Sequence, residues 1–396
     1  MKRRKFIRNT GISVGGVITL PAITGFNISK NLNSSVNIGI IGTGSRGGGL
    51  IPFINEIENL NIVACCDILP FRLKDALDNA PNQTIGYEDY KDLLNNKDID
   101  AVLIATPFST HHTIALDAIE SGKHVYCEKT LSRGISNNLN LVKKVKNSNI
   151  IFQTGHQYHS SRLYNHVVDI INSDEIGKIT SFDCQWNRNG NWRRPVSDPS
   201  LERLINWRMY KEYSGGLVAE LCSHHIDFVN WVLGENPKTI MGSGGIDYWN
   251  DGRETFDNVH LLFKYPSGIN AKFTSLTSNA LGDYQIKIHG DKGSILLDYA
   301  KAWIYPEKKS ETTYENVDGV SGATSKPWVQ GNGSSIEYEH TDPSKQALID
   351  FRDNILNNTM PLSNVLTGSS TAIAVDLSLQ ALHNEKITYW KDSYNS

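Results

Sequence analysis

Cysteine is scarce in this chain, and no charge of either sign is in large excess. The 396 residues include five cysteines, an odd number that argues against a disulfide framework in a chain of this length. The formal net charge of −3 leaves no basic footprint of the kind that nucleic-acid-binding proteins carry. No apolar run reaches the roughly 18 residues that a membrane-spanning helix needs. An apolar content of 39% over this length is ordinary for a globular protein of two or three domains.

The first 35 residues differ from the rest. The basic opening "MKRRKFIRNT" precedes the uncharged and mildly apolar "GISVGGVITLPAITG", which is the layout of a signal peptide. Phe6 follows the arginine pair by two residues, as in the twin-arginine export signal. We expect residues 1–35 to be this signal and a linker, and the protein to be periplasmic. The segment has no clean A-x-A cleavage site, so the alternative that the signal stays uncleaved and anchors the protein in the membrane is kept.

Residues 36–155 alternate between short buried-strand patterns and helical patterns. "VNIGIIG", "NIVACCD", "DAVLIAT", "HVYCE" and "IIFQTG" are apolar runs, and an amphipathic segment separates each from the next. Strands that alternate with helices imply a parallel sheet covered on both faces. We therefore expect an α/β domain with a doubly wound parallel sheet over residues 36–155.

Residues 156–396 have a different pattern. Runs of alternating polarity at 178–186, 258–265, 269–278, 284–290 and 294–299 suit an antiparallel sheet with one face in water. Helical patterns occur before and among them, and a helical pair at 345–358 and 370–384 closes the chain. This predicts an α+β domain with a large open, mostly antiparallel sheet, whose final helices are free to pack back on the first domain.

The segment "GTGSRG" contains Gly42, Gly44 and Gly47 in the pattern G-x-G-x-x-G. The motif is weak alone, but here it directly follows a predicted strand and opens a helix. Asp67 lies twenty residues after Gly47, at the end of the next strand, where an acidic residue would accept hydrogen bonds from the adenosine ribose. This combination predicts a dinucleotide site and favours NAD over NADP. Arg46 is close enough to assist a phosphate.

On these residues the chain resembles the Gfo/Idh/MocA oxidoreductases. The resemblance extends over residues 36–390 and is strongest in "ATPFSTHHTIALDAIESGKHVYCEKT", with further matches in "GGLVAELCSHHIDFVNWVLG" and "IHGDKGSILLD". Thr130 departs from the family, which usually has proline there. The resemblance implies a Rossmann domain and a cofactor site to which Ser45, Thr106, Pro107, His111, Glu128 and Lys129 also contribute.

The resemblance further implies three catalytic residues. Lys129 would hold the reacting hydroxyl, and burial can lower the pKa of such a lysine. His224 would act as the acid or base, since the unperturbed pKa of histidine lies near neutrality. Glu220 lies four residues before His224, on the same face of a predicted helix, where the family has aspartate.

Sugar contacts are expected from four stretches. They are His156, Gln157 and His159 in "GHQYHSS"; Trp192, Arg193, Arg194, Trp207 and Arg208 in the aromatic and arginine-rich segments; and Asp227. Aromatic faces stack on sugar C–H surfaces, whereas arginine and asparagine bind hydroxyls. Packing between sheet and loop explains the tryptophans and arginines about equally well, and the alternative for Asp227 is that it orients His224. We expect no metal site, because no cysteine or carboxylate cluster of ligand spacing accompanies the histidines.

The favoured interpretation is an exported NAD-dependent oxidoreductase that acts on a sugar or glycoside. One alternative is a glycoside hydrolase of the same family, which oxidises, eliminates, adds water and reduces again with bound NAD. Another is a non-catalytic sugar or nucleotide sensor, since a fold does not fix a function. The family's open sheet commonly buries its exposed face, so we expect a homodimer or homotetramer and no nucleic-acid partner.

Overall fold

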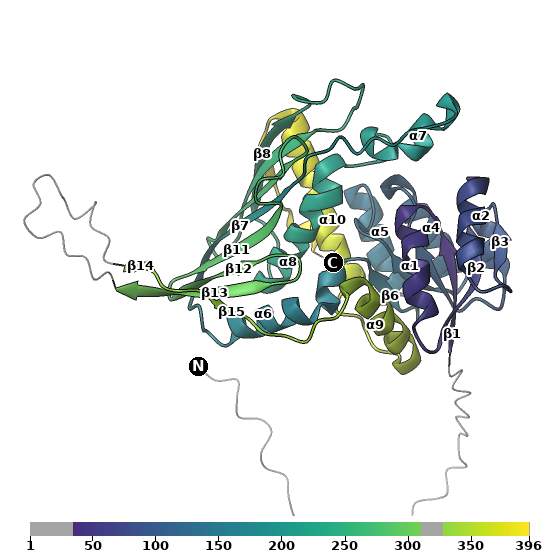
Figure 1. Ribbon diagram of the computed structural model, residues 1–396, viewed down its shortest axis with the longest axis horizontal. Helices are drawn as coiled ribbons and strands as arrows, with labels where there is room; N and C mark the ends of the chain where they lie inside the picture. The colour runs from purple at the N-terminus through teal and green to yellow at the C-terminus, as the bar shows by residue number, and fades with distance from the viewer. Residues whose placement is uncertain (1–34, 310–327, 396) are drawn as a thin grey trace, which may run out of the picture. The chain divides into compact units, whose positions relative to one another are not determined.

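The computed structural model describes residues 35–309 and 328–395 (Figure 1). The predicted export signal therefore lies outside the described residues, apart from its last residue. All five cysteines are described, and each is free and buried.

The first half of the chain forms a six-stranded parallel sheet in the order β3-β2-β1-β4-β5-β6, which confirms the predicted Rossmann architecture. Its strands are β1 (Val36–Ile41), β2 (Leu60–Cys66), β3 (Ile85–Tyr87), β4 (Ala101–Ile104), β5 (His124–Cys127) and β6 (Phe152–Thr154). Its helices are α1 (Ser45–Asn55), α2 (Pro70–Asn79), α3 (Tyr90–Asn95), α4 (His111–Glu120) and α5 (Ile135–Lys146). The strand order reverses between β1 and β4, where such sheets bind ligands.

The strands of this sheet are apolar on both faces because helices cover both. Ile38 and Ile40 belong to one core cluster and Ile41 to another, and all three are 2% exposed or less. Alternate residues of β1 thus enter opposite layers, as expected for a strand enclosed on both sides.

The second half forms a ten-stranded sheet in which β7 and β10 are the one parallel pair along the described path. Its order is β14-β13-β12-β11-β7-β10-β9-β8-β16, with β15 beside β13, which confirms the predicted large and mostly antiparallel sheet. The strands are β7 (Ile179–Asn187), β8 (Thr239–Gly245), β9 (Asn258–Lys264), β10 (Asn270–Leu276), β11 (Tyr284–Gly290), β12 (Gly293–Leu297), β13 (Ala302–Lys309), β14 (Trp328–Gln330), β15 (Ser334–Ser335) and β16 (Thr388–Tyr389).

The longer helices of the second half are α6 (Arg162–Asn172), α8 (Ser223–Leu233), α9 (Pro343–Asn357) and α10 (Val365–Asn384). Between β7 and α8 lie the one-turn helix α7 (Glu202–Ile205) and a π-helical turn at Val218–Cys222. The π turn falls where the sequence pattern predicts a continuous α-helix.

The two closing helices return to the Rossmann sheet, beside which α9 is drawn in Figure 1. Ala347, Leu348 and Phe351 of α9 join the core cluster that holds Ile38 and Ile40. Among the described residues, α10 is the one helix long and apolar enough to cross a membrane, but 72% of its apolar window is buried. It packs against α5, α8 and β8, which is the environment of a core helix.

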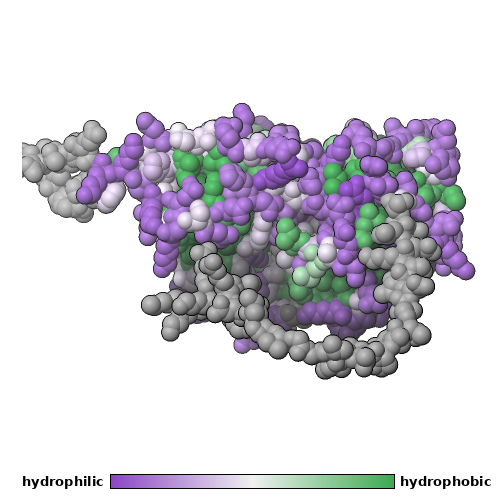
Figure 2. All heavy atoms as spheres, turned by 90° about the horizontal axis from the view of Figure 1, so that it is seen from below, coloured by the Kyte–Doolittle hydropathy of each residue, from purple (hydrophilic) through white to green (hydrophobic). Residues whose placement is uncertain are grey.

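Apolar side chains also reach the outer face of the second sheet. Met241 on β8 pairs with Leu262 on β9, and both are more than a third exposed, as is Tyr389 on β16. Seen from below, apolar areas of the surface alternate with hydrophilic ones (Figure 2).

Candidate active site

The glycine segment forms a cradle between β1 and α1. Gly42 has a φ of +87°, which favours glycine, and a Cβ on Gly47 would lie 2.0 Å from the Gly42 carbonyl oxygen. Gly44 is the N-cap of α1 and no side chain caps the helix, so the amides of its first turn stay available. An uncapped N-terminus with this close backbone approach suits a pyrophosphate.

Asp67 lies at the end of β2 beside this cradle, and it is 6% exposed. Its Oδ2 accepts a hydrogen bond from the Thr43 amide at 2.9 Å, and its Oδ1 accepts one from the Leu69 amide at 2.9 Å. These bonds fix the carboxylate at the wall of a groove of about 490 Å³. Ser45, Arg46, Thr106 and Pro107 line the same groove, as the sequence predicts for cofactor contacts.

A smaller cavity of about 220 Å³ shares part of its lining with the groove. It brings together the three predicted catalytic residues, Lys129, Glu220 and His224. The residues that line both spaces are Arg46, Ala105, Thr106, Trp207 and Arg208. Gln157, His111 and Glu128 complete the polar part of the cavity wall. Phe108, for which no contact was predicted, adds an apolar side chain to it.

Lys129 is held by the π turn that precedes α8. Its Nζ donates to the Glu220 carbonyl oxygen at 2.9 Å and lies 3.8 Å from the Glu220 carboxylate. The same carboxylate accepts from Arg208 Nε at 2.7 Å. Burial alone would raise the pKa of Glu220, yet the Lys129 and Arg208 charges hold it below its ordinary value. Burial lowers the pKa of Lys129, against the opposing effect of Glu220.

His224 lies on the first turn of α8 and is 5% exposed. Burial, followed by the nearby Lys129 charge, holds the pKa of His224 well below its ordinary value, so the ring is neutral and can accept a proton. Its Nδ1 is enclosed without a hydrogen-bond partner among the described residues, which leaves Nε2 as the nitrogen that opens on the cavity. Tyr158 and Trp186 pack against the imidazole, with ring centroids 5.3 and 5.4 Å away.

Hydrogen bonds of His111 and Thr130 connect the segments that form the cavity wall. The two His111 ring nitrogens lie 2.9 Å from the carbonyl oxygens of Thr106 and Thr130. Thr130 Oγ1 donates to the Ala219 carbonyl oxygen at 2.9 Å, and the Lys129–Thr130 peptide is cis. Thr130 thus stands where the family usually has proline, while Lys129 still lines the cavity. His111 supports the loops of this site from within, since it is 1% exposed.

The other predicted histidines lie behind the cavity. His159 Nε2 is 2.9 Å from Asp227, and His156 Nδ1 is 3.8 Å from the same carboxylate. All three residues are 2% exposed or less and none lines the cavity, whereas Gln157 does. The structure therefore gives His156, His159 and Asp227 a packing position behind His224, not one in the cavity wall. No group of three or more His, Cys, Asp and Glu side chains in residues 35–309 and 328–395 is arranged to hold a metal ion.

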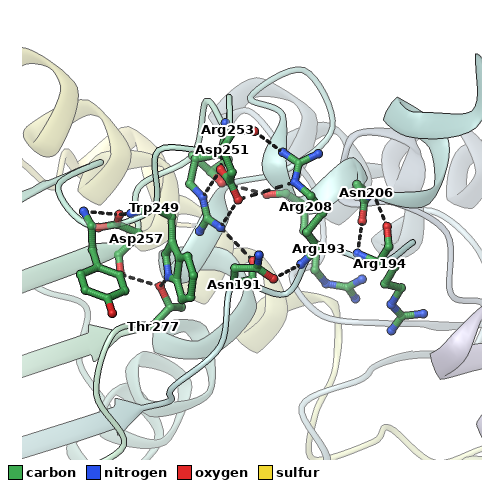
Figure 3. A network of polar contacts seen from close by, with 12 residues as sticks. Asn191, Arg193, Arg194, Asn206, Arg208, Trp249, Asp251, Arg253, Asp257 and Thr277 are labelled. Atoms are coloured by element: carbon green, nitrogen blue, oxygen red, sulfur yellow. Dashed lines mark hydrogen bonds and ion pairs between the residues drawn. The ribbon is translucent and has the colours of Figure 1, made fainter. Parts of the chain in front are cut away.

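The predicted sugar-contacting residues of the tryptophan- and arginine-rich segments lie in four different places. Trp207 and Arg208 line the cavity, and the Arg208 guanidinium lies 4.2 Å from the Trp207 ring centroid. Arg193 is instead paired with Glu202 and donates to the Asp251 carbonyl oxygen at 2.9 Å (Figure 3). Trp192 packs against the core of the second domain. Arg194 reaches the glycine cradle, away from the cavity where a sugar contact was expected.

Together, these features define a class of protein. A glycine cradle that a Cβ would fill, an uncapped helix N-terminus and a fixed acidic residue fit NAD, and the groove leads to a cavity with a buried lysine and a neutral histidine. Residues 36–156 match the oxidoreductase family with an NAD-binding Rossmann fold, and residues 164–296 match the Gfo/Idh/MocA C-terminal domain. The chain belongs to the Gfo/Idh/MocA family of oxidoreductases, and its cofactor is NAD.

Similar proteins act on sugars and related compounds. The chain is 27% identical over 345 residues to 2,7-anhydro-N-acetylneuraminate hydratase of Escherichia coli. The aligned region covers 84% of this chain and 87% of the relative. The fold of this chain matches that of a levoglucosan dehydrogenase complexed with NADH and levoglucosan, with a TM-score of 0.72 at 19% identity over 90% of this chain and 99% of that one. An aldose–aldose oxidoreductase from Caulobacter crescentus gives a TM-score of 0.71 at 18% identity, covering 90% and 100%.

Proposed function

We propose that this protein is a dehydrogenase that transfers hydride between a sugar or glycoside carbinol and tightly held NAD. The observation that carries the proposal is the meeting of Lys129, Glu220 and His224 in one cavity that shares its wall with the dinucleotide groove. When bound, NAD accepts a hydride from carbon and can return it. The preference for NAD over NADP rests on Asp67, whose charge disfavours a 2′-phosphate.

The side chains divide the work according to their charge states. His224 is neutral and accepts the hydroxyl proton at Nε2, acting as general base. Lys129 donates a hydrogen bond to the substrate oxygen, and the Glu220 carboxylate favours the charged form of that lysine. Gln157 and Arg208 offer hydrogen bonds to neighbouring hydroxyls, with the Trp207 ring supplying an apolar face.

A hydrolase or hydratase-like activity is the second candidate. The Escherichia coli relative is named a hydratase, and hydration involves no net redox change. In that reaction bound NAD would accept the hydride and later return it, while the same base and lysine would move the proton and hold the oxygen during oxidation, elimination, water addition and reduction. A non-catalytic sensor remains the third interpretation, against which the intact Lys129 and His224 argue.

We also propose that the protein works in the periplasm after twin-arginine export, as a homodimer or homotetramer. The signal pattern in residues 1–35 supports the first part. Met241, Leu262 and Tyr389 on the outer face of the sheet support the second. Because free NAD is scarce outside the inner membrane, such a protein would be loaded before export and would recycle its cofactor on the enzyme.

The test uses the purified protein without added cofactor, mixed with free sugars and nitrophenyl glycosides. The absorbance of reduced nicotinamide and the release of nitrophenol are recorded together. The dehydrogenase predicts lasting reduction without stoichiometric nitrophenol. Catalytic nitrophenol release without lasting reduction would instead establish the hydrolase, and silence in both channels with NAD bound would favour the sensor.

A further inference from the structure

Both arginines and carboxylates line the dinucleotide groove, and Asp67, Glu88 and Asp89 are the carboxylates that belong to no ion pair in the described residues. Five arginines line it, namely Arg46, Arg72, Arg194, Arg203 and Arg208. Three of them have carboxylate partners: Arg46 with Glu128, Arg203 with Glu212 and Glu254, and Arg208 with Glu220. Within the described part of the chain, Arg72 and Arg194 have none. These two guanidinium groups are therefore free to bind an anion.

Both free arginines lie at the glycine cradle. A Cβ on Gly44 would lie 3.3 Å from Arg72 Nη1, which places that guanidinium beside the N-cap of α1. Arg194 Nη1 donates to Ser45 Oγ, in the first turn of α1, at 2.5 Å. Burial, followed by the Arg208 and Arg72 charges, lowers the pKa of Arg194. Like charges without a counter-ion repel one another, and an anion placed between them would relieve that repulsion.

Arg194 comes from the second domain, and its backbone is fixed there. The Arg194 amide donates to Asn206 Oδ1 at 2.7 Å, and its carbonyl oxygen accepts from Asn206 Nδ2 at 2.9 Å. Asn206 is 2% exposed, so this pair of hydrogen bonds between its side chain and the Arg194 backbone is shielded from water.

The preceding residues of the same loop are held as firmly, as Figure 3 shows. The Asn191 side chain accepts from the Arg193 amide at 3.0 Å, and its carbonyl oxygen accepts from Arg253 at 2.9 Å. Arg253 in turn forms a bidentate pair with Asp251, and that pairing lowers the pKa of Asp251 to about 2. Because this part of the loop is already fixed, the Arg194 backbone loses little conformational entropy when the guanidinium binds.

We propose that Arg194 is a cofactor clamp, which reaches across from the second domain and binds the dinucleotide pyrophosphate at the first turn of α1. Ser45 holds the guanidinium at the cradle, and a phosphate oxygen there would meet Arg194, Arg72 and the free amides of the helix. Contact with both domains would slow the release of NAD. This proposal rests on NAD binding and is independent of which sugar reaction the protein performs.

The test measures binding to protein freed of nucleotide, by calorimetry with NAD, ADP-ribose and adenosine. Losing one charged phosphate contact in Arg194→Gln should weaken NAD and ADP-ribose roughly ten- to hundredfold. Adenosine, which has no phosphate, should bind within about twofold of wild type. Arg194→Lys should fall between the two, because an ammonium lacks the fork of donors. Arg162→Gln, which removes a surface arginine paired with Glu339, is the matched control and should leave all three affinities unchanged.

Two results would overturn the proposal. One is unchanged NAD affinity in Arg194→Gln, and the other is an equal loss for adenosine, which would mean general damage to the groove. The urea midpoint of each ligand-free variant checks that the domain is folded. Since no sugar is involved, failure here is distinguishable from failure of the proposed dehydrogenase activity.

Discussion

The buried carboxylate of Glu220 is the charge on which the cavity most depends. It lies 2.7 Å from Arg208 Nε and 3.8 Å from Lys129 Nζ, and its side chain is 10% exposed. Glu220→Gln keeps the shape and removes the charge. Deleting one member of a buried ion pair costs about 3–5 kcal/mol, and Arg208 is 33% exposed and can regain water, so we expect about 2–3 kcal/mol.

The pH dependence of this loss has a definite sign. The pKa of Glu220 in the folded protein lies below its ordinary value of 4.5, so its stabilising effect is complete above that value. The effect disappears as the pH falls through the folded-state pKa. The difference in unfolding free energy between wild type and Glu220→Gln should therefore be full near neutrality and shrink in acid below 4.5.

Lys129 should respond to the same substitution. With Glu220 neutral, burial is opposed less strongly, so the pKa of Lys129 falls further below its ordinary value. Competitive acetylation of Lys129, followed by mass spectrometry across a pH series, measures this without a known substrate. Glu220→Asp keeps the charge and should shift the titration less, and Glu339→Gln on the surface should not shift it at all. An unchanged or raised Lys129 pKa in Glu220→Gln would show that the Glu220 charge does not control the protonation of this lysine.

Three further substitutions have expected outcomes. His224→Ala should lower turnover by about 10²- to 10⁴-fold while the calorimetric affinity for NAD stays unchanged, since His224 lines the cavity and not the groove; an equal loss of NAD binding would contradict its role as base. Asp67→Ser should raise the ratio of NADP to NAD affinity by roughly tenfold or more, because the charge that repels a 2′-phosphate is gone; an unchanged ratio would remove Asp67 from the selectivity argument. Burial raises the pKa of Asp376 from 3.8 to about 7, so the folded protein retains a proton that the unfolded chain loses, and stability falls as pH rises between those values. Asp376→Asn should flatten that dependence in urea titrations and stabilise the protein above neutrality by at most about 4 kcal/mol, whereas an identical slope in both proteins would count against the assignment.

The parts of the fold that the sequence predicts best are those with strong local patterns. The predicted cofactor motif is local, since about thirty residues hold the strand at Val36–Ile41, the three glycines and Asp67. Apolar β-branched residues favour the strand, and glycine favours the positive φ of Gly42. Strand β8 was missed because Gly242, Gly244 and Gly245 are poor strand formers. In the structure, β9 and β16 flank β8 and pair with it, which a local pattern does not reveal.

Side-chain direction in loops could not be predicted in the same way. Arg193, Arg194 and Arg208 belong to one region rich in arginine and tryptophan, yet they take different positions. Arg193 pairs with Glu202, Arg194 reaches the glycine cradle, and Arg208 lines the cavity and pairs with Glu220. Arg193 is positioned by Asp251 and Arg194 by Asn206, and the sequence pattern predicts neither contact. Likewise, the π turn at Val218–Cys222 aims the Glu220 carbonyl at Lys129, a contact that an i,i+4 pattern does not contain.

The proposed function depends on hydride transfer between a carbinol carbon and the NAD held in this chain. To test it, the NAD-containing protein is incubated with perdeuterated sugars and glycosides, and the nucleotide is then released and its mass determined. We expect reduced nicotinamide that carries one deuterium, and none in His224→Ala. Nucleotide without deuterium after contact with every sugar class, in a protein that retains NAD, would rule out the proposed hydride transfer.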